Sequence, residues 1–132
     1  MRLTLAKDLA PLKAEALRRI DAAAEQARAA WITPGSGQAL VYQAKAAEAG
    51  RYLAASPPPA DLSSYPLLAA EVGLTAPNAL ALAQVWQRMD GDWTAAAARI
   101  ERARLEAKRA MDEARTPDEI ARAAAWPKRE AS

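Results

Sequence analysis

Cysteine, histidine and phenylalanine are all absent from this chain of 132 residues. Without cysteine or histidine there can be no disulfide, no thiolate or imidazole nucleophile, and no metal site built from those ligands. Any catalysis would have to rest on Asp, Glu, Lys, Tyr or Ser, and no cluster of carboxylates suggests such a centre. We therefore expect neither an enzyme, nor a cofactor, nor a small-molecule substrate.

Large aliphatic side chains are scarce. Leucine, isoleucine and valine together number 21, whereas alanine alone numbers 37. Alanine is the best helix former, but it buries little apolar area. Disorder usually combines low hydrophobicity with high net charge, and the net charge here is only +2. The composition thus predicts helices with a thin core, which favours a homo-oligomer or a partner protein.

The charges are interspersed and the apolar runs are short. Although the isoelectric point is about 9.1, residues 76–115 hold seven basic and six acidic side chains. Such a mixed surface opposes nucleic-acid binding, which favours a basic block. No apolar run approaches the length of a membrane span, and residues 1–13 lack the apolar stretch of a signal peptide. We expect synthesis in the cytosol and no contact with a membrane.

The first 55 residues predict an arm followed by two helices. Residues 1–8 alternate in polarity and could form a strand or an ordered arm. A helix is expected over 9–31, with Asp8 as its cap, and a second over 37–55, with Ser36 as its cap. Residues 33–37 are rich in glycine and form a turn between helices, since they lack the Lys-Ser/Thr pair of a phosphate-binding loop. The apolar face of the first helix steps by three and four residues through Leu17, Ile20, Ala24, Ala27 and Trp31.

Three shorter segments complete the outline. Residues 56–64 include three consecutive prolines and predict a stiff linker or, as an alternative, a docking site for a proline-reading domain. A short helix is expected over 66–72. A last helix is expected over 117–125, because Thr116 and Glu119 have the spacing of a capping box. A charged tail follows over 127–132.

The longest predicted element is a helix over 76–115, capped by Thr75. Although Asp90-Gly91 is a turn signal, the apolar spacing keeps its phase across it, and a glycine within a helix costs only about 1 kcal/mol relative to alanine. The sequence therefore predicts an all-α fold, a single helical domain over 1–132. It would be a hairpin, bundle or coiled coil built on this one helix. The heptad seam runs through Leu82, Trp86, Met89, Trp93, Ala96, Ile100, Ala103, Ala107, Ala110 and Ala114.

A polar stripe marks the helix predicted over 37–55. Its members share one face of a 3.6-residue helix. The stripe is too polar for an ordinary core, so it is either a hydrogen-bonded packing face, a contact face for a partner, or a Lys–Glu–Tyr catalytic cluster. In the packing interpretation Lys45 and Glu48 pair locally, three residues apart. The residues of the stripe are Gln38, Tyr42, Lys45, Glu48, Ala49 and Tyr52.

The four tryptophans are the largest apolar side chains of the chain. Trp86 and Trp93 lie one heptad apart on the seam and are expected in the core. Trp126, near the end of the chain, suits a core position or an exposed interface equally well. Together with the polar stripe, these three tryptophans are the candidate packing or interaction residues.

Three stretches resemble a known group of proteins: ITPGSGQALVYQAKAAEAGRYLA at 32–54, YPLLAAEVGLTA at 65–76, and ARIERARLEAKRAMDEARTPDEI at 98–120. They are similar to small alanine-rich proteins encoded in phage and prophage tail gene clusters, close to tail-fibre and baseplate genes. That group is itself similar to tail-fibre-assembly-like proteins. The resemblance covers nearly the whole chain after residue 10. Its most specific part is Gly35-Ser36-Gly37-Gln38 with the tyrosines, lysine and glutamate of the polar stripe.

The resemblance implies a virion component or an assembly factor, and it brings no active site. The first possibility is a structural or adaptor protein that docks to the tail fibre or baseplate. The second is a tail-fibre assembly chaperone that is absent from the mature virion. Either role implies synthesis in the host cytoplasm, with the first ending in the virion tail.

Overall fold

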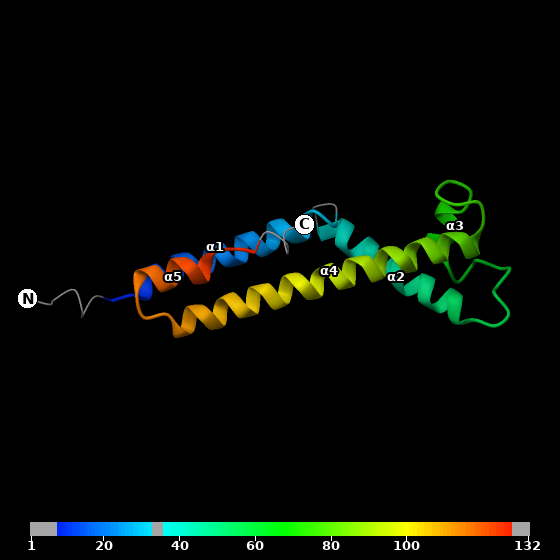
Figure 1. Cartoon of the computed structure of the whole chain (residues 1–132). Helices are drawn as coiled ribbons and strands as arrows, with labels where there is room; N and C mark the ends of the chain where they lie inside the picture. The colour runs from blue at the N-terminus through cyan, green and yellow to red at the C-terminus, as the bar shows by residue number, and fades with distance from the viewer. Residues whose placement is uncertain (1–7, 33–35, 128–132) are drawn as a thin grey trace, which may run out of the picture. The chain divides into compact units, whose positions relative to one another are not determined.

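The computed structural model describes residues 8–32 and 36–127 of the chain (Figure 1). In this part the structure is 75% helical and has no strand, which confirms the all-α prediction and the presence of one long helix. The predicted ends of the helices differ from the observed ones by at most three residues. The helices of the described residues are α1 Ala10–Ala29, α2 Ser36–Ala54, α3 Pro66–Glu71, α4 Ala79–Glu113 and α5 Pro117–Ala124.

The helices of the described residues belong to two compact units. Unit 1 contains the described residues up to Trp31 and from Ala96 onward, and unit 2 contains those from Ile32 to Ala95. Helix α1, the C-terminal part of α4 and α5 therefore form unit 1. Helices α2 and α3 and the N-terminal part of α4 form unit 2.

In unit 1, α1 runs antiparallel to the C-terminal part of α4. Ile20 of α1 is fully buried and belongs to one apolar cluster with Met111. Further along α1, Ala24 and Ala27 form a second cluster with Ile100. As the residue numbers rise along α1, those of the contacting residues on α4 fall, which is the arrangement of a helical hairpin. Small alanines bring the two helices close, so a few large side chains suffice to fill the space between them.

Helix α5 closes the end of this hairpin. Its start confirms the predicted capping box: the Thr116 hydroxyl accepts a hydrogen bond from the Glu119 amide at 3.1 Å, and Pro117 occupies the first turn. The Glu119 carboxylate accepts from the amide of Arg115 at 2.6 Å. Ile120, 5% exposed, then joins the cluster of Ile20 and Met111.

Trp126 packs against both clusters of unit 1 and is half-buried. Its indole Nε1–H is buried, yet it has no hydrogen-bond acceptor among the described residues. A buried donor without a partner costs about 1–3 kcal/mol.

We therefore expect Trp126→Phe to change the free energy of unfolding by less than about 1 kcal/mol, because removal of the unpaired donor offsets the loss of buried apolar area. Trp126→Ala should cost about 3 kcal/mol.

Urea unfolding followed by circular dichroism measures this difference. Equal losses for the two substitutions would show that the indole N–H carries no penalty.

The end of α1 differs from the prediction. The helix stops at Ala29, so Trp31 does not continue its apolar face and is 39% exposed. The Arg99 guanidinium lies 5.9 Å from the centre of the Trp31 ring. At the N-terminal end of this face the buried residue is Ala16, whereas the sequence predicted its neighbour Leu17.

Helix α4 is continuous through Gly91, as the phase of the apolar residues predicted. Its start was predicted wrongly. The helix begins at Ala79, and the side-chain oxygen of Asn78 accepts a hydrogen bond from the Ala81 amide at 2.8 Å. Thr75 instead donates its hydroxyl to Glu71 at 2.7 Å.

The heptad seam is not one buried stripe. Leu82, Ile100 and most of the seam alanines are buried, but Met89 is 52% exposed and Ala110 is also exposed. Met111 is buried where the seam predicted Ala110. A straight helix has 3.6 residues per turn, so it drifts by about 20° per heptad from a repeat of 3.5. Over the length of α4 this drift moves the buried face by one residue.

In unit 2, α2 and α3 pack with the first turns of α4 around an apolar cluster. Leu68 of α3 and Leu82 and Ala83 of α4 are fully buried there. Leu62, in the proline-rich segment, packs against the same cluster. Between α3 and α4 the chain makes a tight turn, in which Gly73 adopts φ +87 and its amide donates to the Ala76 carbonyl at 2.7 Å. That positive φ favours glycine.

Three predictions concern residues outside the described part of the chain. These are the arm over 1–8, except for Asp8, the middle of the turn over 33–37, and the tail from Lys128 onward. Asp8 lies one residue before the helix cap and accepts a hydrogen bond from the Ala10 amide at 3.0 Å.

Candidate functional site

The polar stripe of α2 centres on a buried carboxylate. Glu48 is 5% exposed. Its oxygens accept hydrogen bonds from the backbone amides of Leu67 and Leu68, each at 3.0 Å. These amides are at the start of α3, where Pro66 has no N–H and Tyr65 provides no side-chain cap. Glu48 thus caps the N-terminus of α3 from a different helix, by accepting the hydrogen bonds of its first amides. Its negative charge also interacts favourably with the positive end of the helix dipole.

Lys45 does not pair with Glu48, which corrects the predicted local pair. Its ammonium group forms an ion pair with Glu71, at the end of α3, and lies 5.2 Å from the centre of the Trp86 ring. The pairing differs because both Glu48 oxygens already accept backbone N–H groups. Helix α3 is therefore held to α2 at both ends, by Glu48 at its start and by Lys45 at its finish.

The hydrogen bonds from Lys45 and Thr75 hold the pKa of Glu71 below its ordinary value. A carboxyl whose pKa is lower in the folded state stabilises the fold above its unfolded pKa, here about 4.5, and that contribution is lost as the pH falls through the folded pKa. We expect Glu71→Gln to be less stable than the wild type near neutral pH. The difference should shrink steadily toward pH 3.

Urea unfolding midpoints between neutral pH and pH 3 test this expectation. Glu106→Gln is the control, because Glu106 makes an exposed pair with Arg102 at 3.3 Å, and such pairs contribute about 0–1 kcal/mol. A gap between Glu71→Gln and the wild type that stays constant with pH would contradict the role given to the Glu71 charge.

The tyrosines of unit 2 extend the same cluster. Tyr52 is buried and meets Tyr65 edge-on, with 5.6 Å between ring centres and 87° between ring planes. The Arg51 guanidinium lies 5.3 Å from the Tyr65 ring centre and donates a hydrogen bond to the Ser64 carbonyl at 3.0 Å. Every contact in this group fixes the segment that leads into α3.

The structure therefore brings four of the candidate residues into one cluster: Lys45, Glu48, Tyr52 and Trp86. Tyr42 is half-buried and Gln38 is exposed, both on α2, and Trp93 is half-buried on α4. Trp126 is in unit 1. The partners that the sequence did not reveal are Glu71, Tyr65 and the amides of Leu67 and Leu68. No signal in the sequence identified these partners, because the N–H groups of a helix start do not indicate which distant acceptor will meet them.

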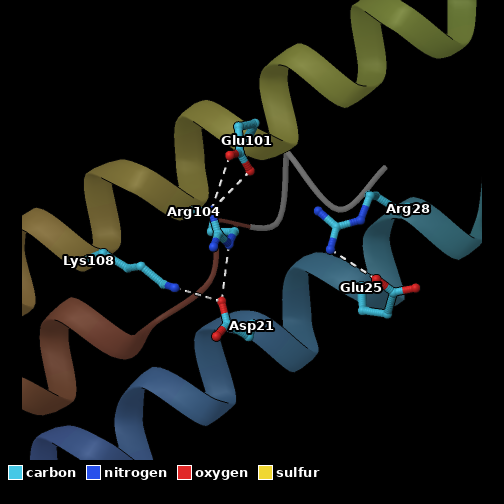
Figure 2. Close-up of polar contacts among 6 residues, drawn as sticks. All are labelled: Asp21, Glu25, Arg28, Glu101, Arg104 and Lys108. Atoms are coloured by element: carbon cyan, nitrogen blue, oxygen red, sulfur yellow. Dashed lines mark hydrogen bonds and ion pairs between the residues drawn. The ribbon is translucent and has the colours of Figure 1, made fainter.

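A second polar cluster fastens α1 to α4 in unit 1 (Figure 2). The Asp21 carboxylate of α1 forms ion pairs with two residues of α4, with the Lys108 ammonium at 3.0 Å and with the Arg104 guanidinium at 3.1 Å. Arg104 also donates to Glu101 of its own helix. The hydrogen bond from Lys108, with that from Arg104, holds the pKa of Asp21 below its ordinary value. Figure 2 also shows Glu25 paired with Arg28 at 2.9 Å, within α1.

The charged groups of both clusters are engaged by partners within the chain. Glu48 is engaged by two amides, Lys45 is neutralised by Glu71, and Asp21 is neutralised by two cations. Among residues 8–32 and 36–127, no group of three acidic side chains gathers where it could hold a metal ion. An open hollow of about 450 Å³ follows one face of α4 from Ala98 to Arg109, but only this helix lines it, so it is a groove on the surface.

Comparisons with family models, curated proteins and solved structures found no match to this chain. The resemblance to phage tail-cluster proteins therefore depends on the three sequence stretches alone. In the described residues, no helix combines the length and the apolar character needed to cross a membrane.

Proposed function

We propose that this protein is a non-catalytic structural or adaptor protein of a phage tail, which docks to the tail fibre or baseplate through its helical surfaces. The observation that carries the proposal is an apolar seam left partly uncovered. Met89 is at a seam position of α4, yet it is 52% exposed. Trp93, the next residue of the seam, is only half-buried.

The polar groups support a role in binding. The buried and half-buried charges of unit 2 hold α3 in place, and those of unit 1 hold α1 against α4. Their chemistry is used for folding, which leaves surface complementarity as the property available for function. Methionine suits such a surface, because its flexible and polarisable side chain adapts to irregular partners.

Co-purification with the tail-fibre and baseplate proteins encoded beside its gene tests the proposal. We expect the wild type to bind one of them and Met89→Glu to bind at least about ten-fold more weakly, since a charge placed in an apolar contact is costly. Gln87→Glu is the matched control, because it introduces the same charge at an exposed position two residues away. Binding to none of these proteins, or equal binding by both variants, would refute docking at this surface.

Mass spectrometry of purified particles then separates an adaptor from the alternative, a tail-fibre assembly chaperone. An adaptor is present in the mature particle in a fixed ratio to the fibre or baseplate. A chaperone binds the fibre protein but is absent from the particle, and that result would overturn the adaptor role.

A further inference from the structure

Helix α3 is short and depends on the rest of unit 2 for its structure. It has six residues and no side-chain cap of its own. Isolated helices shorter than about 12–15 residues are marginal in water. Leu68 is the only buried residue of α3 and joins the apolar cluster of α2 and α4, whereas Ala69 and Ala70 are exposed. Apolar packing therefore provides only part of what keeps α3 in place.

Two carboxylates provide the rest, one at each end of the helix. Glu48 of α2 accepts hydrogen bonds from the amides of Leu67 and Leu68 at 3.0 Å. At the other end, Glu71 forms its ion pair with Lys45 of α2. Hydrogen bonds to an ionised carboxylate are roughly twice as strong as those to a neutral acceptor. Both attachments join α3 to α2, and both depend on a negative charge.

The other charged groups near α3 do not hold it by a charge that acid removes. Arg51 of α2 lies against the Tyr65 ring and stays protonated in acid. Asp61, in the segment before α3, accepts hydrogen bonds from Ser63 within its own loop. Residues 79–87, the turns of α4 that join the apolar cluster, contain no charged side chain. Glu48 and Glu71 are therefore the acid-sensitive groups that hold α3.

The contacts between α2 and α4 do not depend on a carboxylate. The Lys45 ammonium lies 5.2 Å from the centre of the Trp86 ring, and it keeps its charge in acid. Tyr52 of α2 and Leu82 of α4 belong to the same apolar cluster. In unit 1, Asp21 is 51% exposed, and exposed ion pairs contribute little to stability. Loss of carboxylate charge should therefore affect α3 before the other helices.

We propose that α3 is an acid-released lid on the apolar cluster of unit 2. Protonation of Glu48 and Glu71 detaches α3 from α2, while the other helices keep their structure and the cluster that Leu68 joins becomes accessible to solvent. The hydrogen bonds from Lys45 and Thr75 hold the pKa of Glu71 below its ordinary value. The charge that closes the lid is thus present at neutral pH and is lost as the pH falls through that lowered pKa. The lid does not require a tail partner, so its test is separate from docking to fibre or baseplate.

Hydrogen exchange between pH 7 and pH 2.5, expressed as protection factors, measures the release. The Leu67 amide reports the bond to the carboxylate of α2, and the Val72 amide reports the helix itself, since it donates to the Leu68 carbonyl at 2.9 Å. As the pH falls, protection of both should drop at least about ten-fold before that of Tyr52 in α2 or Ile100 in α4 changes. Loss of protection at all four amides together, or at none of them, would overturn the proposal.

The double variant Glu48→Gln/Glu71→Gln should have the lid released at neutral pH, because it removes both charges and keeps the size of both side chains. Its Val72 amide should be at least about ten-fold less protected than that of the wild type at pH 7. Glu101→Gln/Glu106→Gln is the matched control, since these glutamates pair with arginines of their own helix. The control should keep α3 protected at pH 7 and release it in acid, as the wild type does.

Nile red, an uncharged dye that brightens on apolar surfaces, reports whether the cluster becomes accessible. It should brighten with the wild type in acid and with Glu48→Gln/Glu71→Gln at pH 7, but not with the control at pH 7. Equal protection of Val72 in this double variant and the wild type would show that charge does not close the lid. Loss of Ile100 protection in the double variant, or no rise in dye fluorescence, would show that α3 is not a separate lid.

Discussion

Replacing Glu48 with alanine should destabilise unit 2 by about 3 kcal/mol. The substitution leaves the amides of Leu67 and Leu68 without the acceptor that they have at 3.0 Å. A hydrogen bond to a charged group contributes about 1.5–3 kcal/mol, and leaving a buried donor unpaired adds the cost of its lost hydration. Since α3 has only six residues and no side-chain cap of its own, it should lose its structure first.

Glu48→Gln should lose less, because its amide oxygen can still accept one hydrogen bond although the charge is gone. Glu106→Ala is the control for removing a glutamate from an exposed pair, and it should change the stability by less than about 1 kcal/mol. Hydrogen exchange of the Leu67 and Leu68 amides reports the loss locally. If Glu48→Ala were as stable as Glu106→Ala, Glu48 could not be the cap of α3.

Replacing Leu82 with alanine should cost about 3 kcal/mol. Leu82 is 0% exposed, within the cluster that joins α2, α3 and α4. Shortening a buried leucine loses its transfer free energy and leaves a cavity, which together cost about 2–5 kcal/mol. In a thin, alanine-rich core few neighbours are large enough to move into the space.

Leu80→Ala is the matched control, two residues away on the same helix and 43% exposed. It removes the same atoms from a position that leaves no cavity, so it should cost less than about 1 kcal/mol. Urea unfolding of both variants gives the comparison. Equal losses of unfolding free energy would show that the cluster around Leu82 is packed too loosely for the shortened side chain to cost stability.

Local signals were enough to predict the helices. Thr116, Pro117 and Glu119 specify the start of α5 through contacts within one turn, so no distant residue was needed. The apolar spacing across Gly91 predicted a continuous α4, because a single glycine costs less than several turns of packing contribute. The start of α4 was predicted less well, since Thr75 and Asn78 are both acceptable caps, and the Thr75 hydroxyl instead donates to Glu71, four residues earlier.

The candidate site was predicted only in part. The spacing of Lys45, Glu48 and Tyr52 placed them on one face of α2, which follows from the helical repeat alone. It could not supply their partners, because Glu71 and the amide of Leu68 are separated from them by the proline-rich segment. Periodicity predicts which residues are neighbours on one helix. It does not predict which donors from another segment will reach an acceptor such as Glu48 in the folded chain.

The sequence by itself determined the class of structure: helices, from abundant alanine, and no cysteine or histidine chemistry, from the absence of both residues. Only the tertiary structure decided which faces are covered. It buried Met111 where the heptad repeat favoured Ala110, because a helix of 3.6 residues per turn drifts from a repeat of 3.5. It also turned Lys45 and Glu48 of α2 toward α3, because the amides at the start of α3 needed an acceptor and Glu48 was within reach.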